Sequence, residues 1–165
     1  TELKSIFAQN VTEGISLRFI SGNPLTGRKI DANGELRAYD SQVTVIPEGD
    51  DVHEAFGWAS FSPKRYSAGA TYFSHRENYR LDARLMGGPR AIIVSNEYDK
   101  VFPLDIFPEQ LIKAILAFNI DKMEQLGIYE VAPEDFALCE FVDTSKLELQ
   151  RIVRTGLDML RKEME

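Results

Sequence analysis

The hydrophobic pattern of this chain changes its period near Pro103, and this change constrains the fold more than any other feature. Before it, short runs rich in apolar and β-branched residues predict strands; these runs are residues 15–20, 42–46, 55–61, 68–73 and 91–95. After it, apolar residues recur three and four positions apart, which is typical of amphipathic helices. The sequence therefore predicts an α+β fold in which a β-rich part precedes an all-helical part.

Local signals predict where individual elements of the β-rich part begin and turn. Residues 1–10 carry apolar side chains at helical spacing, which predicts a short amphipathic helix before the first strand. The dipeptide Asn33-Gly34 favours a hairpin turn between the first two predicted strands. We therefore expect the sheet to start with a hairpin closed at these residues.

Two helices are predicted directly after the change of period. Pro108 suits the first position of a helix, because its missing N–H has no partner there in any case. An apolar stripe then predicts a helix over about residues 108–118. A shorter helix should cover about residues 120–126 and end at Gly127, a residue that readily adopts positive φ.

Two further helix starts are visible nearer the C-terminus. Pro133 is followed by Glu134 and Asp135, which places two carboxylates at the positive end of a short helix. Ser145 and Glu148 have the spacing of a capping box, in which each side chain bonds the backbone of the other. The apolar residues that follow predict a final helix of about four or five turns.

Composition excludes several functions. The chain has 165 residues and a net charge of −7, so it lacks the basic face with which proteins displace counterions from duplex nucleic acid. Its single cysteine excludes an internal disulfide. No window approaches the roughly 18 apolar residues of a membrane helix, so no membrane span is expected. Neither repeats nor a low-complexity linker divide the chain, which has room for one substantial domain or two small ones.

Two segments carry the spacing of an iron–sulfur ligand run, C-x-x-C-x-x-C-x-x-x-C-P, without its cysteines. We call them the first and second frames; the first has Ile92, Ser95, Tyr98 and Phe102 at the ligand positions, and the second has Pro133, Phe136, Cys139 and Asp143. Pro103, Pro108 and Leu111 complete the pattern after the first frame. One thiolate cannot hold a cluster, so we expect a helical lobe that resembles a ferredoxin domain but binds no metal and no cofactor.

Five blocks of sequence, in order, resemble the A subunit of the bacterial Na+-translocating NADH:quinone oxidoreductase. They are residues 18–27, 43–46, 56–59, 101–108 and 134–142. The resemblance implies the C-terminal part of that protein, in three regions. Residues 1–48 would be part of a β-grasp domain of the soluble-ligand-binding type, residues 49–97 a β-rich connection, and residues 98–165 the ferredoxin-like helical domain without cluster cysteines.

The resemblance also implies a function. The intact complex oxidises NADH, passes electrons through flavins and iron–sulfur centres of other subunits to ubiquinone, and exports Na+. The A subunit of that family is a peripheral protein on the cytoplasmic face of the bacterial inner membrane, associated with quinone binding and docking. We therefore expect this chain to act as a non-catalytic assembly or interaction module whose partners are other subunits, with quinone as a further candidate ligand.

The densest aromatic region supplies the candidate interaction residues. In that hypothesis Trp58 would anchor a partner subunit or a quinone headgroup together with Phe56 and Tyr66, and Lys64 and Arg65 would lie at the rim. Aromatic side chains are also strong sheet formers, so packing inside the β-rich part is the other interpretation. Exposure of Trp58 would distinguish the two.

Other motifs have simpler explanations. Residues 22–29 resemble a phosphate loop, but Arg28 stands where lysine is required and Pro24 removes a backbone donor, so a tight turn is predicted. His53 and His75 lack a second ligand nearby in sequence and are interpreted as surface residues. Cys139 has apolar neighbours, which favours a buried structural thiol.

Two rival functions remain. The β-grasp part could be a free-standing module that binds a small ligand, which requires a pocket with converging polar groups. An enzyme with an unrecognised site would require a cleft that holds strongly perturbed titratable groups.

Overall fold

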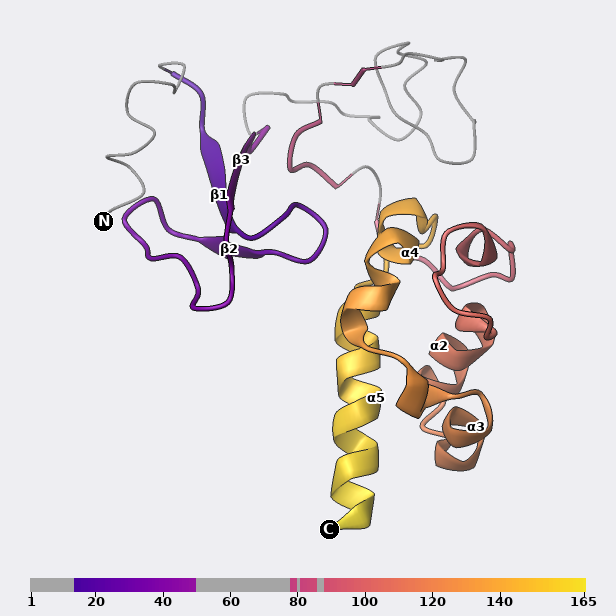
Figure 1. The fold of residues 1–165 in the computed structure, drawn as a ribbon. Helices are drawn as coiled ribbons and strands as arrows, with labels where there is room; N and C mark the ends of the chain where they lie inside the picture. Colours follow the sequence, from indigo (N-terminus) through magenta and orange to yellow (C-terminus); the bar gives the residue numbers. More distant parts are fainter. Residues whose placement is uncertain (1–13, 50–77, 80, 86–87) are drawn as a thin grey trace. The chain divides into compact units, whose positions relative to one another are not determined.

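The computed structural model describes residues 14–49, 78–79, 81–85 and 88–165 (Figure 1). The chain separates into two compact units, Thr1–Gly87 and Gly88–Glu165, which we call the sheet unit and the helical unit. The described residues contain one three-stranded antiparallel sheet and four α-helices, so the predicted α+β class is confirmed. The helix expected at residues 1–10 and the strands expected at 55–61 and 68–73 lie outside the described residues.

The sheet has the order β2-β1-β3, so β1 (Leu17–Ser21) lies between β2 (Arg28–Ile30) and β3 (Val43–Pro47). Both pairings are antiparallel, and Phe19 of β1 lies opposite Ile30 on one side and Val45 on the other. β1 and β3 match the predicted strands within two residues. β2 is only three residues long and was not predicted.

The turn between β1 and β2 is closed by Asn23. Its side-chain Oδ1 accepts hydrogen bonds from the N–H groups of Leu25 and Thr26, both at 2.8 Å, and its carbonyl accepts one from Gly27 at 2.9 Å. A Cβ at Gly27 would lie 2.3 Å from that carbonyl oxygen, so only glycine fits. The N–H groups of Leu25, Thr26 and Gly27 are bonded within the loop and are not free to bind a phosphate. This agrees with the predicted tight turn.

The Asn33-Gly34 turn has a different place from the one predicted. The Gly34 N–H bonds to the carbonyl of Asp31 at 2.8 Å, so a local turn does form. It lies within the connection from β2 to β3, and these two strands are not neighbours in the sheet. The two predicted strands do pair antiparallel, as β1 and β3, but β2 forms between them in the chain, so this turn does not close a hairpin.

The helical unit contains short 3₁₀ segments and four α-helices. In chain order these are η2 (Tyr98–Lys100), α2 (Pro108–Leu116), α3 (Ile120–Gln125), η3 (Ile128–Glu130), η4 (Pro133–Phe136), α4 (Ala137–Val142) and α5 (Leu149–Met164). All four predicted helices in this region are confirmed. In Figure 1, α5 forms one long rod and α2 and α3 lie together along the same side of it.

The core of the helical unit lies along α5, which packs against both α2 and α4. Leu111, Ile112, Leu149 and Val153 are fully buried there. α2 and α5 approach closely at Gly156, where an added Cβ would lie 3.0 Å from a side-chain carbon of Ile115. Glycine at this helical position therefore serves close packing between the two helices.

Residues 91–95 are not a strand, contrary to the prediction. This segment is fixed to the helical unit by separate hydrogen bonds. Arg90 N–H donates to the Ser145 carbonyl at 2.8 Å, and Ser145 Oγ donates to the Ala91 carbonyl at 3.2 Å. The hydrogen bonds of this segment go to Ser145 and Glu109 of the helical unit, so its β-forming residues are held in place without a sheet.

The predicted capping box at Ser145 and Glu148 does not form. Glu148 is the residue before α5, and its side chain makes no capping hydrogen bond. Instead the carboxylate of Glu140, on α4, accepts a hydrogen bond from the N–H of Gln150 at 3.0 Å. The start of α5 is thus stabilised by a neighbouring helix, which local sequence does not indicate.

Candidate functional site

The ligand positions of the two frames face the interior of the helical unit. Five of them are buried, namely Tyr98, Pro133, Phe136, Cys139 and Asp143, and three are partly buried, namely Ile92, Ser95 and Phe102. Some residues between them are exposed, such as Ile93 at 63% and Leu138 at 46%, whereas Ala137 is buried. The spacing identified in the sequence therefore marks inward-facing positions, although other side chains stand in place of the thiolates.

A buried polar network joins the two frames. The Tyr98 hydroxyl donates to Asp143 Oδ1 at 2.8 Å, and both residues are only 2% exposed. Asp143 also accepts hydrogen bonds from the N–H groups of Ser145 at 2.9 Å and Leu147 at 2.8 Å. Burial, and then the bond to Asp143, raise the pKa of Tyr98 far above its usual value. The phenol therefore stays protonated and keeps donating to a carboxylate.

An aromatic pair joins the frames at a second place. The rings of Phe102 and Phe136 lie 4.7 Å apart between centroids, tilted at 51°. Cys139, one turn further along the second frame, is fully buried, and its Sγ lies 4.0 Å from the Tyr98 carbonyl oxygen. Burial raises the pKa of Cys139 to about 12, so the thiol is neutral and unreactive, as expected for a structural cysteine.

A second buried carboxylate is also engaged. Glu109, the second residue of α2, is 2% exposed and accepts hydrogen bonds from Ser95 N–H at 3.1 Å and Ser95 Oγ at 3.3 Å. The positive end of the helix dipole favours its negative charge. Glu109 therefore holds the segment before α2 in place. Its carboxylate oxygens, like those of Asp143, accept hydrogen bonds from groups of the protein.

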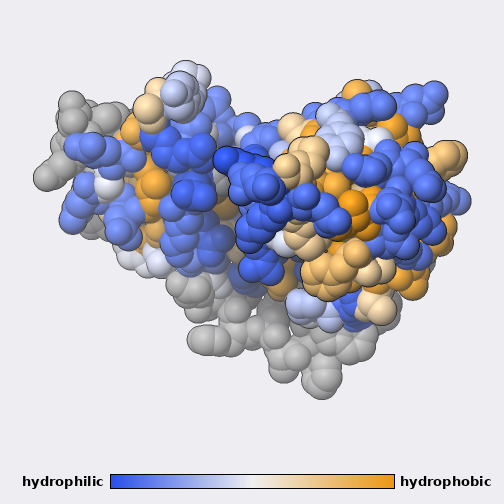
Figure 2. Space-filling view, turned by 90° about the horizontal axis from the view of Figure 1, so that it is seen from below, coloured by the Kyte–Doolittle hydropathy of each residue, from blue (hydrophilic) through white to orange (hydrophobic). Residues whose placement is uncertain are grey.

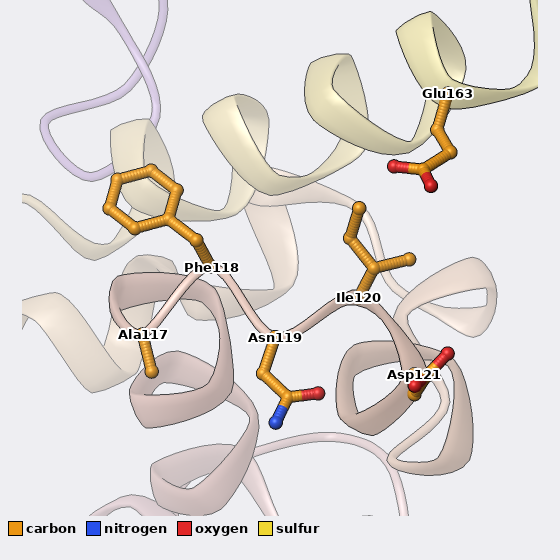
Figure 3. A pocket seen from close by; sticks show the side chains of 6 residues that line it. All are labelled: Ala117, Phe118, Asn119, Ile120, Asp121 and Glu163. Carbon is orange, nitrogen blue, oxygen red and sulfur yellow. The ribbon is translucent and has the colours of Figure 1, made fainter.

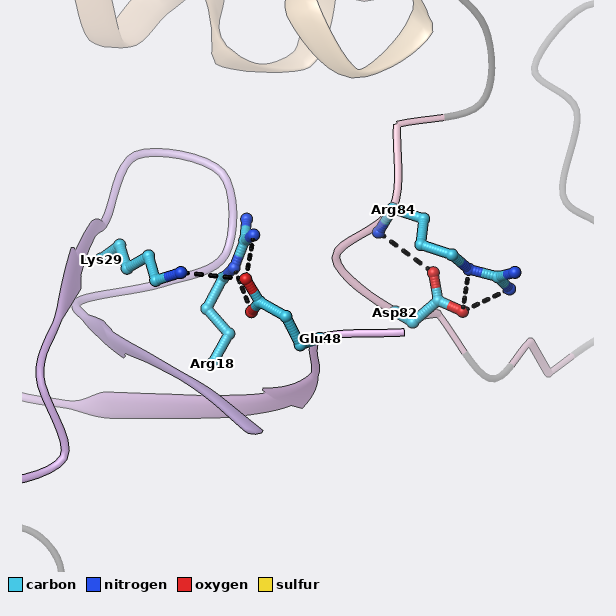
Figure 4. Close-up of polar contacts among 5 residues, drawn as sticks. All are labelled: Arg18, Lys29, Glu48, Asp82 and Arg84. Carbon is cyan, nitrogen blue, oxygen red and sulfur yellow. Dashed lines mark hydrogen bonds and ion pairs between the residues drawn. The ribbon is translucent and has the colours of Figure 1, made fainter. Parts of the chain in front are cut away.

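The charged cluster of the sheet unit links its three strands (Figure 4). Arg18 donates hydrogen bonds to both carboxylate oxygens of Glu48, at 2.7 and 2.6 Å, and Lys29 donates a third at 2.9 Å. The hydrogen bonds from Arg18 and Lys29 lower the pKa of Glu48 to about 2. Nearby, Asp82 and Arg84 form a pair at 2.6 Å. These ion pairs stabilise the local fold.

A shallow depression of about 420 Å³ lies in the helical unit between the turn after α2 and the end of α5 (Figure 3). Its lining residues are Ala117, Phe118, Asn119, Ile120, Asp121 and Glu163. In Figure 3 Phe118 and Ile120 point toward α5, whereas the amide of Asn119 points away from it. That amide is engaged in capping α3 through the N–H of Lys122 at 3.0 Å. Polar groups do not converge here, as a specific ligand pocket requires.

Apolar surface gathers over the helical unit (Figure 2). The large apolar side chains of this unit that are more than one third exposed include Leu104, Phe107, Leu116, Phe118, Tyr129, Leu138 and Phe141. Polar side chains interrupt them in Figure 2.

The aromatic interaction hypothesis stays a prediction. Its residues Phe56, Trp58, Lys64, Arg65 and Tyr66 lie outside the described residues, as do His53 and His75. Within the described ranges, no three His, Cys, Asp or Glu side chains gather in a way that suits a metal ion. The same ranges contain no helix with the length and apolar character needed to cross a membrane.

Fold and site together define an α+β protein whose helical unit is packed around a buried hydrogen-bond network and an aromatic pair. Over nearly its whole length the chain is similar to curated proteins that are named as the A subunit of the Na(+)-translocating NADH-quinone reductase. Identity is 35% over 162 residues with that of Haemophilus influenzae (strain PittEE), covering 96% of this chain and 36% of the relative. It is 35% over 165 residues with that of Yersinia pestis bv. Antiqua (strain Angola), covering 98% and 36%.

The relative from Neisseria meningitidis serogroup B (strain ATCC BAA-335 / MC58) is 35% identical over 150 residues, covering 88% of this chain and 33% of its own length. No family model matches the chain. The chain thus spans about a third of the length of the curated relatives that it matches. The resemblance inferred from the five sequence blocks is confirmed, and the chain is a homologue of part of that A subunit.

Proposed function

We propose that this chain works as the C-terminal part of the A subunit in a respiratory Na+ pump that oxidises NADH, reduces ubiquinone and exports Na+. The observation that carries this proposal is the 35% identity to relatives of that name over 88% to 98% of the chain. In this proposal NADH, the flavins and the iron–sulfur centres are bound by other subunits of the complex. The chain itself is placed peripherally, on the cytoplasmic face of the inner membrane.

Within the pump we propose a non-catalytic role in assembly. A general acid or base must come within hydrogen-bond reach of its substrate. Three groups of the helical unit have raised pKa values. Tyr98 and Cys139 are 2% and 0% exposed, and burial in a packed core is the main cause of their shifts. Tyr129 is exposed, and its hydroxyl already donates to Glu124, which raises its pKa. These shifts therefore give no support to the rival enzyme function.

The proposed partners are the other subunits of the complex. Hydrophobic side chains on the surface of the helical unit, such as Phe118 at 71% and Leu138 at 46% exposure, are suited to contacts with another protein. Quinone is a second proposed ligand, at the aromatic region around Trp58.

The test separates assembly from catalysis in the complete complex. Phe118→Ser and Leu138→Ser are introduced singly into the full-length A subunit, and complex yield and quinone reduction per assembled complex are measured separately. We expect at least one variant to lower the yield severalfold with turnover per complex unchanged. Arg154→Ser, at another exposed position of the helical unit, is the matched surface control and should leave both quantities unchanged.

Two results would contradict the proposal. Normal yield with reduced turnover would assign a catalytic role to this part of the protein. Failure of the full-length A subunit, carrying an affinity tag, to purify with the complex would show that it is not part of the pump. In that case, stabilisation of the isolated chain by a small molecule would favour the free-standing ligand-binding module.

A further inference from the structure

The contacts between the two frames follow a specific crossed pattern. In ferredoxins with two clusters, each C-x-x-C-x-x-C-x-x-x-C run gives three cysteines to one cluster and its fourth cysteine to the other. Applied to this chain, that rule defines two crossed sets. The first set is Ile92, Ser95, Tyr98 and Asp143, and the second is Pro133, Phe136, Cys139 and Phe102.

Both principal contacts between the frames fall within these crossed sets. The hydrogen bond of 2.8 Å joins Tyr98 and Asp143, which are the third and fourth members of the first set. The ring pair with centroids 4.7 Å apart joins Phe102 and Phe136, which both belong to the second set. In both of these contacts the last position of one frame meets an earlier position of the other frame, as shared ligation of a cluster requires. A third, longer contact, from the Cys139 thiol to the Tyr98 carbonyl oxygen at 4.0 Å, joins the two sets to each other.

Backbone contacts support the first set independently. The hydrogen bonds between residues 90–91 and Ser145 hold the start of the first frame beside the end of the second. Ile92 directly follows the first segment, and Asp143 lies two residues before Ser145. The two ends of the first crossed set are therefore brought to the same part of the core.

The helices after the two frames repeat the same arrangement. Phe102 precedes the start of α2 at Pro108 by the same number of residues by which Asp143 precedes the start of α5 at Leu149. Ile115 and Gly156, which touch, are each the eighth residue of their helix. Equivalent positions of the two helices thus meet, as they do around an internal two-fold axis.

We propose that the helical unit retains the ligand geometry of a two-cluster ferredoxin, with Tyr98 and Asp143 filling one four-iron cluster position and Phe102 and Phe136 filling the other. The first position is occupied by a hydrogen-bonded pair, and the second by a tilted pair of aromatic rings. This inference concerns the interior of the unit and does not rest on the proposed function. It predicts that either position binds a four-iron cluster once cysteines are substituted at all four residues of its set.

The second set offers the simpler test because Cys139 is already present. Phe102→Cys, Pro133→Cys and Phe136→Cys complete it in the full chain. The control places the third new cysteine within the second frame instead, as Asp143→Cys with Pro133→Cys and Phe136→Cys. Both variants then carry four cysteines and differ only in whether the set is crossed.

Each variant is incubated anaerobically with ferric iron, sulfide and excess dithiothreitol, which supply iron, sulfur and reducing equivalents, and is then desalted in the presence of a chelator. We expect the crossed variant to keep about four irons per chain and a broad visible absorption band. The uncrossed control and the natural chain should keep severalfold less iron. Equal iron in the crossed and uncrossed variants, or more in the uncrossed one, would overturn the proposal.

If a cysteine variant fails to fold, double-mutant cycles that measure the free energy of unfolding test the crossed contacts instead. We expect Tyr98→Phe with Asp143→Ala, and Phe102→Leu with Phe136→Leu, to lose less stability than the sum of their single variants. The pair Tyr98→Phe with Phe102→Leu, within one frame, should be additive. Coupling within the first frame without coupling across the frames would refute the crossed geometry.

Discussion

The bond between Tyr98 and Asp143 allows a quantitative test of how the helical unit is stabilised. Tyr98→Phe removes only the hydroxyl, so the buried ring keeps its packing. A hydrogen bond to a charged group contributes about 1.5–3 kcal/mol, and Asp143 keeps two backbone donors after the change. We therefore expect a loss of about 2 kcal/mol in the free energy of unfolding, with a fall in Tm on the order of 10 °C for a unit of this size.

Urea titration followed by far-UV circular dichroism measures this change, because the described helices all lie in the helical unit. The matched control is Tyr129→Phe. Its hydroxyl also donates to a carboxylate, Glu124, at 2.7 Å, but Tyr129 is 55% exposed, so water can replace the bond and no measurable loss is expected.

The partner substitution provides the second half of the test. Asp143→Ala leaves the Tyr98 hydroxyl and the N–H groups of Ser145 and Leu147 without their acceptor and should lose about 3–5 kcal/mol, since each buried unpaired donor costs about 1–3 kcal/mol. In the double variant Tyr98→Phe/Asp143→Ala the loss should be about 1.5–2 kcal/mol smaller than the sum, because no phenol is left unpaired. If Tyr98→Phe behaves like Tyr129→Phe and the double variant is additive, the buried network does not stabilise this unit.

Three further predictions concern packing and titration. Gly156→Ala should destabilise the chain by about 1–2 kcal/mol despite the helix preference of alanine, because its Cβ would press on Ile115, and Ile115→Ala should make the combined loss less than additive in urea titrations. Cys139 should react with a thiol reagent at pH 8 only after unfolding, since it is fully buried and its pKa is raised to about 12. Glu48 has a pKa lowered from 4.5 to about 2, so its contribution to stability is complete above pH 4.5 and disappears as the pH falls toward 2. Carboxyl NMR titration should show this low pKa and its return toward 4.5 in Arg18→Gln.

Each of these predictions has a clear contrary result. A more stable Gly156→Ala chain would mean that the contact between α2 and α5 is loose. Rapid labelling of Cys139 in the folded chain would show that its surroundings open readily. An ordinary pKa for Glu48 would mean that the contacts of Arg18 and Lys29 with its carboxylate do not persist in solution.

Helices were predictable from sequence where their signals are local. Pro108 and the apolar stripe after it define α2, and Asn119, which caps α3 through the N–H of Lys122, lies in the predicted place between the two helices. Such signals involve residues within one or two turns, so they act in the same way in almost any tertiary context.

Strands and caps were less predictable because distant partners decide them. β2 contains Arg28 and Lys29 and shows no alternation; it is a strand because β1 supplies its hydrogen bonds. Residues 91–95 have strong β propensity but no neighbouring strand, and their inward positions follow the spacing of three that defines the frame, not the period of two of a sheet. Ser145 does not cap α5, because its N–H bonds to Asp143 and its hydroxyl to the Ala91 carbonyl.

The frame positions were recognised from spacing alone, but the pairings between them were not. Nothing in the local sequence indicates that Tyr98 meets Asp143 or that Phe102 meets Phe136. These contacts depend on how two distant segments fold onto each other. The candidate interaction residues around Trp58 lie outside the described residues, and their role remains a prediction.

The buried pair of Tyr98 and Asp143 has an evolutionary consequence. A carboxylate at 2% exposure is costly once its hydroxyl donor is gone, so a change at one position creates pressure for a change at the other. Among divergent homologues the two positions should therefore vary together. The exposed pair of Tyr129 and Glu124 is under no such constraint, and its members should drift separately.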